Sequence, residues 1–278
     1  MNVGKSLYEK VVGKWQASRA LATQVRNFEN WPAVWSAYRV NKTLPLFRLR
    51  NGLVLHHVTS DDPIFLFSEI FIQHCYFRPS FYTPTASHTV LDVGANIGFF
   101  ALYLQSLAPG IRVHCFEPGE DARSRLDTNV KINRLESMVS IYPMAIFDTE
   151  ATLELKEAAM PAHRSLFANQ FVEGARSTTV QAIPLEKAIE LSKSTHVDLL
   201  KIDVEGAEIE IVEGADPKCW ENIERLVVEY HDLLRPGCKE RVTRLLRSRG
   251  YRGIHAFETS PGLGLLQVQR QPFSVNQQ

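Results

Sequence analysis

Two acidic residues at the ends of apolar runs are the first features of this sequence that could do chemistry. Asp92 ends one run within "VLDVGANIGFF" (90–100), and it opens a glycine turn of the form D-x-G-x-N-x-G. Glu117 ends the next run, "HCFEP". A glycine turn between a strand and a helix offers backbone N–H groups to a cofactor, and an acid about 20 residues downstream accepts hydrogen bonds from ribose hydroxyls. The pair therefore indicates a site for a cofactor that contains adenosine.

The residues of the turn discriminate among such cofactors. A dinucleotide fingerprint reads G-x-G-x-x-G and presents its amides to a pyrophosphate. Here Asn96 takes the place of the middle glycine, and Asp92 precedes the first one. A carboxylate at that position repels a phosphate and attracts an ammonium group. We therefore expect S-adenosyl-L-methionine rather than NAD, FAD or a nucleoside triphosphate.

A second set of charged residues follows two later apolar runs. "LLKIDVEG" contains Lys201, Asp203 and Glu205, and "VVEYHD" contains Glu229 and His231. If the two runs are neighbouring parallel strands, these side chains meet at the same edge of the sheet. Charges inside a buried strand are costly unless they are paired. A structural ion pair between Lys201 and Glu229 therefore remains as plausible as a functional role, whereas we favour function for Asp203 and His231.

The elements that must position these residues follow from the alternation of strand and helix patterns after residue 89. Such alternation is typical of a parallel sheet with helices on both faces. Two closing strands joined by a short turn imply one antiparallel edge strand. The pattern predicts an α/β fold of the class I methyltransferase (Rossmann-like) type, with a seven-stranded, mostly parallel sheet. The expected strands are 89–94, 112–118, 139–147, 197–204, 225–231, 250–258 and 263–269, with a hairpin insertion at 151–157 and 177–183.

The region before residue 46 is predicted to be an N-terminal helical extension (1–45), separate from a methyltransferase domain (46–278). Apolar residues recur at helical spacing from 5 to 38, and Pro32 starts or breaks a second helix there. Asn51-Gly52 between two apolar runs predicts a hairpin. "DDPIFLFSEIFIQHCYF" (61–77) is expected to be an apolar helix that closes over the site. We expect the extension to pack on the domain or to form a homodimer.

Composition restricts the class of protein. The chain has 278 residues, of which 45% are hydrophobic, and its 31 basic and 31 acidic residues give a formal net charge of zero. A nucleic-acid-coating protein usually has a basic excess, so no nucleic-acid partner is expected. No segment approaches the roughly 18 apolar residues that span a bilayer. The four cysteines are scattered, without metal-ligand spacing. A cytoplasmic, reduced protein without a metal site or an integral membrane segment is the expectation.

The sequence resembles the FkbM family of S-adenosylmethionine-dependent methyltransferases. The resemblance runs from about residue 45 to 260, and its most specific part is "KIDVEG". The matching segments are "VLDVGANIGFF" (90–100), "FEP" (116–118), "LKIDVEGAE" (200–208) and "VVEYH" (227–231). Members of known function mostly methylate hydroxyl groups of sugars, in glycans and glycolipids, or of natural-product scaffolds. The resemblance implies an O-methyltransferase of this kind.

The resemblance also implies roles for individual residues. It places the turn against the methionine part of the cofactor, Glu117 on the ribose and the backbone around Ala145 against adenine. Pro118 of "FEP" is expected at the cofactor, and Asp203 is expected both at the cofactor and in catalysis. The residues of the turn are Asp92, Gly94, Ala95, Asn96 and Gly98.

Methyl transfer to a hydroxyl requires a positioned acceptor and a base for its proton. An ordinary carboxylate is too weak a base unless burial raises its pKa, and a histidine is better matched to neutral pH. We therefore predict His231 as base or proton relay, with Asp203 or Glu205 orienting it or the acceptor. A divalent ion held by these residues and Glu229 is a minority alternative.

Two other classes of protein remain open at this stage. An NAD(P)-dependent oxidoreductase would use a similar turn, but the sequence lacks a nearby Tyr-x-x-x-Lys pair. A non-catalytic cofactor-binding module would keep the fold without the chemistry. The basic run 235–252 could bind an anionic acceptor, although the solvated face of a surface helix is the favoured interpretation.

Overall fold

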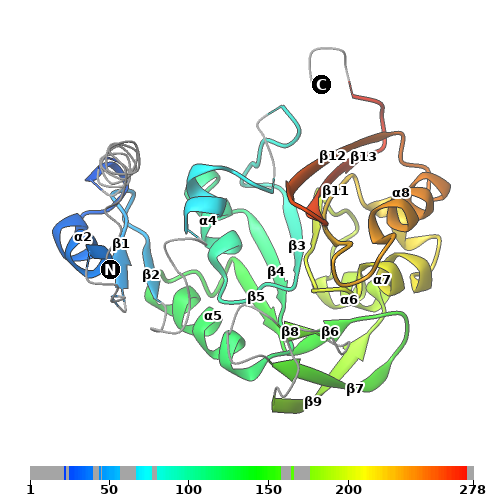
Figure 1. Cartoon of the computed structure of the whole chain (residues 1–278), viewed down its shortest axis with the longest axis horizontal. Helices are drawn as coiled ribbons and strands as arrows, with labels where there is room; N and C mark the ends of the chain where they lie inside the picture. The colour runs from blue at the N-terminus through cyan, green and yellow to red at the C-terminus, as the bar shows by residue number, and fades with distance from the viewer. Residues whose placement is uncertain are drawn as a thin grey trace, which may run out of the picture. The chain divides into compact units, whose positions relative to one another are not determined.

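A computed structural model describes residues 22, 25–39, 44, 46–56, 67–76, 80–157, 164–165 and 176–273 of the chain (Figure 1). The chain divides into two compact units, Met1–Thr59 and Ser60–Gln278. Each unit is described by itself.

The first unit contains a helix and a hairpin. Helix α2 (Trp31–Arg39) begins next to Pro32, as the sequence predicted. Strands β1 (Leu46–Arg48) and β2 (Val54–His56) pair antiparallel around Asn51-Gly52, which confirms the predicted hairpin. The first part of the expected N-terminal helix lies outside the described residues. The compact units divide after Thr59, so the hairpin falls in the first unit, and the predicted domain boundary at residue 45 stays a prediction.

The second unit is built on a seven-stranded sheet in the order β12-β13-β11-β10-β3-β4-β5. Strands β3, β4, β5, β10 and β11 are parallel, and β13 is antiparallel to both of its neighbours. The antiparallel strand therefore lies one place in from the edge, between β11 and β12. The bounds are β3 (Thr89–Val93), β4 (Arg112–Phe116), β5 (Val139–Tyr142), β10 (Leu199–Ile202), β11 (Arg225–His231), β12 (Gly253–Ser260) and β13 (Leu263–Gln269). The predicted fold class is confirmed.

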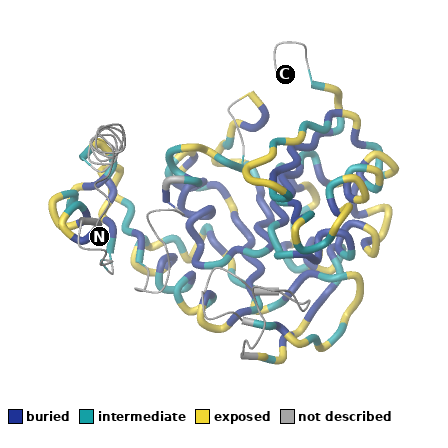
Figure 2. Tube along the Cα trace, in the orientation of Figure 1, coloured by how far each residue is buried: buried dark blue, intermediate teal, exposed yellow. Residues whose placement is uncertain are grey.

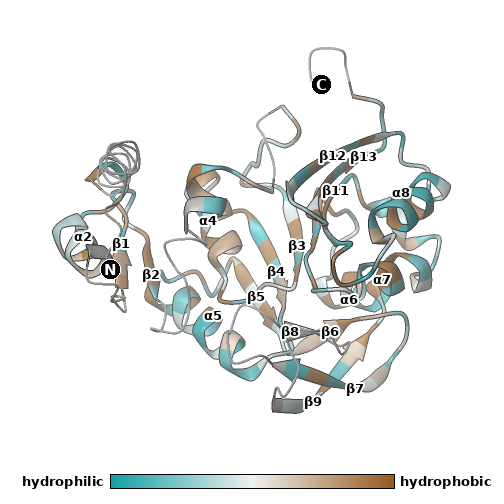
Figure 3. Cartoon of the chain, viewed as in Figure 1, coloured by the Kyte–Doolittle hydropathy of each residue, from teal (hydrophilic) through white to brown (hydrophobic). Residues whose placement is uncertain are grey.

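Helices cover both faces of this sheet. Helices α4 (Phe99–Leu107) and α5 (Glu120–Ile132) lie on one face, and α6 (Leu185–Ser192), α7 (Glu208–Gly214) and α8 (Cys238–Ser248) lie on the other (Figure 1). Every residue of β3 and β10 is buried between these layers (Figure 2). The central strands are apolar along most of their length (Figure 3), as expected for parallel strands covered on both faces.

A proline divides one predicted strand into two. The expected strand 139–147 is instead β5 and β6 (Met144–Ile146), separated by Pro143, because proline cannot donate a hydrogen bond to a continuing ladder. Strand β6 joins a second sheet in the order β6-β9-β7-β8. The remaining strands of that sheet are β7 (Ala151–Glu157), β8 (Arg164–Ser165) and β9 (Arg176–Ile183), and β7 and β9 form the predicted hairpin-type pair.

The expected apolar helix over 61–77 is described only in its second half. There the chain forms one π-helical turn, η1 (Ser68–Ile72). A short 3₁₀ helix, η2 (Cys219–Asn222), precedes β11. No helix among the described residues has the length and apolar character to cross a membrane. All four cysteines are free thiols.

Candidate functional site

The glycine turn after β3 lies directly against the end of β10. Gly94 has a φ of 79°, a left-handed conformation that favours glycine. A Cβ atom added to Gly94 would collide with the main-chain oxygen of Asp203. The Asp203 amide in turn donates to the carbonyl of Val93 over 3.0 Å. The turn therefore needs glycine both for its backbone angle and for its contact with the neighbouring strand end.

Glu117, at the end of β4, is held by the backbone on both of its oxygens. Oε2 accepts from the Asn96 amide over 2.9 Å, and Oε1 accepts from the Gly119 amide over 2.8 Å. Its side chain is buried and lines a cavity of about 100 Å³ together with Pro118 and Ala145. These contacts fix the carboxylate at the place where the sequence expected it to meet ribose hydroxyls.

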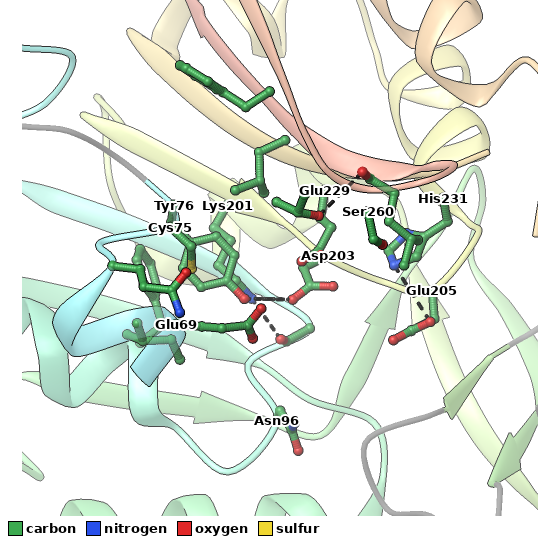
Figure 4. Close-up of a pocket in the computed structure, with 18 of the residues that line it drawn as sticks. Glu69, Cys75, Tyr76, Asn96, Lys201, Asp203, Glu205, Glu229, His231 and Ser260 are labelled. Atoms are coloured by element: carbon green, nitrogen blue, oxygen red, sulfur yellow. Dashed lines mark hydrogen bonds and ion pairs between the residues drawn. The ribbon is translucent and has the colours of Figure 1, made fainter. Parts of the chain in front are cut away.

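A much larger cavity of about 900 Å³ lies on the other side of the turn. Gly94, Asn96, Asp203 and Glu205 line both cavities. The polar wall of the larger one carries Glu69, Cys75, Tyr76, Lys201, Asp203, Glu205, Glu229 and His231 (Figure 4). Apolar side chains line it as well, among them Leu233, Leu234, Phe257, Leu263 and Leu265, and these alternate with Glu258, Thr259, Ser260 and Gln267. One turn of the backbone thus separates a small cavity beside Glu117 from a large cavity rich in carboxyl groups.

Lys201 is a buried cation at the junction of these elements. Its Nζ lies 3.1 Å from Asp92 Oδ1 and 3.4 Å from Asp203 Oδ2, and it donates to the Gly94 carbonyl over 3.0 Å. It also lies 5.0 Å from the centre of the Tyr76 ring. Burial opposes the charge, but the two carboxylates outweigh it and raise the pKa of Lys201. The ion pair between Lys201 and Glu229, one of the two alternatives, is replaced by pairs with Asp92 and Asp203.

Asp203 is held in its ionised form. Burial raises its pKa, but Lys201, His231 and the hydrogen bond that the Tyr76 hydroxyl donates over 3.0 Å outweigh burial, so that the pKa is lowered. Asp203 is therefore a carboxylate at neutral pH, with its oxygen Oδ2 engaged by Tyr76 and Lys201.

His231 lies between two carboxylates at the end of β11. Nδ1 is 2.8 Å from Glu208 Oε1, and Nε2 is 3.6 Å from Glu205 Oε2. Burial lowers the pKa of this imidazole, but Glu208 and then Glu205 outweigh burial and raise the pKa to about 10. His231 is accordingly an imidazolium at neutral pH. A base must be deprotonated to act, so this geometry disfavours the predicted role of His231 as proton acceptor.

The structure brings most of the predicted site residues together. Ala95 lines the large cavity with His231. Asp92 and Gly98 are both described by the structure, and they line neither of the two cavities. The ammonium group that Asp92 meets is that of Lys201, and a Cβ on Gly98 would collide with Leu126 of α5, so both residues support the turn from behind.

Sequence reasoning missed two residues in the polar wall of the large cavity and one residue that holds His231 in place. Glu69 and Tyr76 lie in a segment that the sequence treated only as a cover, and Glu208 was not distinguished from the other acids of "VEGAEIEIVEGA". Glu208 is fully buried and contacts His231, whereas Glu210 and Glu213 pair with arginines. A signal existed only for Glu208, as an acid on the same helical face as the apolar residues of α7.

The basic run 235–252 has partners of its own. Arg235 Nη2 pairs with Glu210 over 2.8 Å, and Arg241 pairs with Glu213, so these arginines join α8 to α7. This supports the surface-helix interpretation over an anion site. Within the described ranges, no group of three or more His, Cys, Asp or Glu side chains has the arrangement of a metal site.

Comparison with known proteins agrees with this geometry. A solved FkbM methyltransferase from Methylobacillus flagellatus KT superposes with a TM-score of 0.53 at 16% identity, over 91% of this chain and 59% of that chain. The present chain thus spans somewhat over half of that protein's length, and the likeness shows the fold. The sheet order and the likeness define a Rossmann-like fold of the kind that this methyltransferase has.

Sequence comparison gives the family. The model of the family described as Methyltransferase FkbM domain matches residues 92–252, more than half of the chain. The 31-O-demethyl-FK506 methyltransferase FkbM of Streptomyces tacrolimicus is 29% identical over 73% of this chain and 87% of its own. The hexuronic acid methyltransferase AglP of Haloferax volcanii is 26% identical over 56% of this chain and 59% of its own. The chain belongs to the FkbM family of methyltransferases.

Proposed function

We propose that this protein is an S-adenosylmethionine-dependent O-methyltransferase that acts on a hydroxyl group of a sugar, a glycan or glycolipid, or a natural product. One observation carries the proposal. The turn at Gly94 and Asn96 forms a shared wall between the cavity beside Glu117 and the large cavity that contains the carboxyl groups. A donor bound along the turn would have its adenosine part on one side and the acceptor on the other.

The residues around the turn fit S-adenosylmethionine better than a dinucleotide. Glu117 is oriented by two backbone amides and can accept hydrogen bonds from vicinal ribose hydroxyls. Asp203 and Glu205 line the walls on both sides of the turn, and carboxylates there repel a pyrophosphate. A cofactor that carries an ammonium group and a sulfonium is attracted by the same charges.

The chain's own residues have separable tasks in this proposal. When bound, S-adenosylmethionine supplies an activated methyl group. Asp203, held ionised by Lys201 and Tyr76, keeps a negative charge beside the positively charged donor. Glu205 and the imidazolium of His231 form an ion pair at the strand end, where they position the acceptor or the turn. The catalytic roles predicted for Asp203, Glu205 and His231 thus become positioning and electrostatic roles.

The acceptor class follows the names of the relatives. One relative is named for a demethylated FK506 and another for a hexuronic acid. Both names support an acceptor with hydroxyl groups. The apolar side chains of the large cavity, which include Leu233, Phe257 and Leu265, would contact an apolar part of the acceptor.

Calorimetric titration with S-adenosylhomocysteine and with NAD tests the proposed cofactor. We expect the first to bind and NAD not to bind. In Glu117→Gln the ribose loses a charged hydrogen-bond acceptor, so affinity for S-adenosylhomocysteine should fall about tenfold or more. Glu120→Gln, at an exposed position of α5, is the matched control and should bind normally. Binding of NAD alone would favour the oxidoreductase, and binding of neither would favour the non-catalytic module.

A methyl-donor assay against a panel of sugars, glycans and hydroxylated natural products, read by mass shift, tests the reaction. We expect one acceptor class to gain a methyl group on oxygen. Methylation on nitrogen or carbon alone would contradict the proposed O-methylation.

A further inference from the structure

In the part of the chain that the structure describes, two carboxyl groups of the large cavity have no hydrogen-bond or ion-pair partner. Asp203 and His231 are both engaged by neighbouring side chains, as described above. Among the described residues, by contrast, no hydrogen bond or ion pair engages the carboxyl group of Glu69 or that of Glu229, although both line the cavity. A polar group that faces a cavity without a partner retains its capacity to bind a ligand. Both carboxyl groups therefore have hydrogen-bonding capacity left for an acceptor.

The two carboxyl groups come from different sides of the cavity. Glu229 extends from β11, next to the end of β10, whereas Glu69 extends from the π-helical turn η1 (Figure 4). The Glu69 side chain points toward Asp203 in this view, and the charge of Asp203 acts on it. Single π-helical turns occur frequently at functional sites. An acceptor hydroxyl bound near Asp203 would therefore have Glu69 on one side and Glu229 on the other.

We propose that Glu69 is the catalytic base that takes the proton of the acceptor hydroxyl, and that Glu229 binds the acceptor through its carboxyl group. The proposal rests on the methyl-transfer function proposed above. In the step, the acceptor oxygen forms the new C–O bond while the C–S bond breaks and its electron pair stays on sulfur. The hydroxyl proton passes to the Glu69 carboxylate, so that the sulfonium charge is neutralised and one proton remains on Glu69.

The titration behaviour of the cavity agrees with this division of tasks. Burial, and then the charge of Asp203, raise the pKa of Glu69 to about 7, which is well matched to a base at neutral pH. Burial and Asp203 raise the pKa of Glu229 well above its ordinary value, so this group is protonated and can donate. Cys75 and Tyr76 on the same segment and Tyr103 on α4 stay neutral because burial raises their pKa values, and His74 contacts the Tyr103 hydroxyl.

Kinetics of Glu69 variants test the proposal in the full-length protein. Glu69→Gln should lower kcat by a factor of roughly 10² to 10⁴, the usual contribution of a general base. Affinity for S-adenosylhomocysteine should change less than about twofold, because Glu69 lines the large cavity and not the small cavity beside Glu117. Glu69→Asp should recover part of the lost kcat. Glu240→Gln, at an exposed position of α8, is the control and should leave kcat unchanged.

The pH profile separates a base from a structural residue. Wild-type kcat should fall on the acid side with a midpoint near pH 7, and Glu69→Gln should lose this limb and keep a low, flat rate. Glu229→Gln should keep the limb and raise KM for the acceptor. Full turnover by Glu69→Gln, with cofactor binding intact, would overturn the base assignment while leaving the proposed function in place.

A measurement on the free protein needs no acceptor. With ¹³C-labelled glutamate, the carboxyl signal missing from the spectrum of Glu69→Gln identifies Glu69 in the wild type. A titration midpoint near pH 7 is expected, and one near the ordinary value of about 4.3 would overturn the proposal. Failure of the wild type to bind S-adenosylhomocysteine would contradict the proposed function instead.

Discussion

At the scale of single residues, the site is organised by where buried charges find partners. Lys201 lies inside the sheet and pairs with Asp92 of the neighbouring strand β3 and with Asp203, just after the end of its own strand. Removing one member of a buried ion pair typically costs 3–5 kcal/mol, because the other charge remains buried and unpaired. The three residues therefore act as one unit, and Asp203 keeps its negative charge through the others.

His231 should make the stability of the protein depend on pH. Its pKa is raised from the ordinary 6.5 to about 10, so its contribution is fully present below about pH 6.5 and is lost as the pH rises through 10. Within that window the advantage of the wild type over His231→Gln should shrink by roughly 1.4 kcal/mol per pH unit. Urea unfolding at several pH values measures this difference.

His196→Gln, at an exposed position, is the matched control and should follow the wild type. Parallel curves for wild type and His231→Gln between pH 7 and 10 would show that Glu208 and Glu205 do not hold the imidazolium.

Individual site residues were predictable to the extent that they sit at strand ends. Glu117, Asp203 and His231 are in this group, because parallel strands finish at one edge and periodicity locates the strands. The protonation state of His231 was not predictable. It depends on Glu208, whose helical spacing indicates a buried position, whereas its contact with His231 follows from the packing of α7 against β11.

At the scale of elements, the turn after β3 should tolerate no side chain at Gly94. Gly94→Ala adds a Cβ at a positive φ and drives it into the Asp203 carbonyl, so β3 and β10 must separate or the turn must move. We expect at least a tenfold loss of affinity for S-adenosylhomocysteine, together with lower stability in urea unfolding.

Gly237→Ala isolates the effect of the collision. Gly237 has a φ of 82°, close to the 79° of Gly94, but a Cβ there meets nothing within 4 Å. This variant should lose only the modest stability that a strained φ costs, of the order of 1 kcal/mol. Equal binding losses in the two variants would mean that backbone strain, rather than contact with β10, explains the requirement for glycine.

Most elements were predictable from the sequence because apolar runs and helical spacing alternate clearly after residue 89. The division at Pro143 was missed because the apolar pattern continues across it. The π-helical form of η1 was missed because a π turn and an α turn have nearly the same sequence signature. The position of β13 between β11 and β12 depends on long-range pairing, which periodicity alone does not specify.

At the scale of the whole molecule, the described walls of both cavities lie within Ser60–Gln278. A fragment of these residues contains the whole seven-stranded sheet and should bind S-adenosylhomocysteine with an affinity close to that of the full chain. Calorimetry on the fragment, with circular dichroism to verify folding, measures this. A folded fragment with strongly weakened binding would show that residues 1–59 contribute to the site.

Composition and length indicated the general class of the protein, but they do not determine its partners, its location or its oligomeric state. The predicted homodimer through the N-terminal helices, the absence of a nucleic-acid partner and the cytoplasmic location all stay predictions. The oligomeric state is accessible by light scattering of the full chain and of the fragment side by side.

The two cavities share few residues, and this has a consequence for divergence within the family. Of the described lining residues, only Gly94, Asn96, Asp203 and Glu205 belong to both. The remaining wall of the large cavity comes largely from 69–76 and 257–267, two segments that do not contribute to the small cavity. Under the proposed function, mutations in those segments would change which acceptor is recognised and would leave the contacts around Glu117 as they are. Acceptor choice and donor binding could then diverge almost independently, except at the four residues that line both cavities.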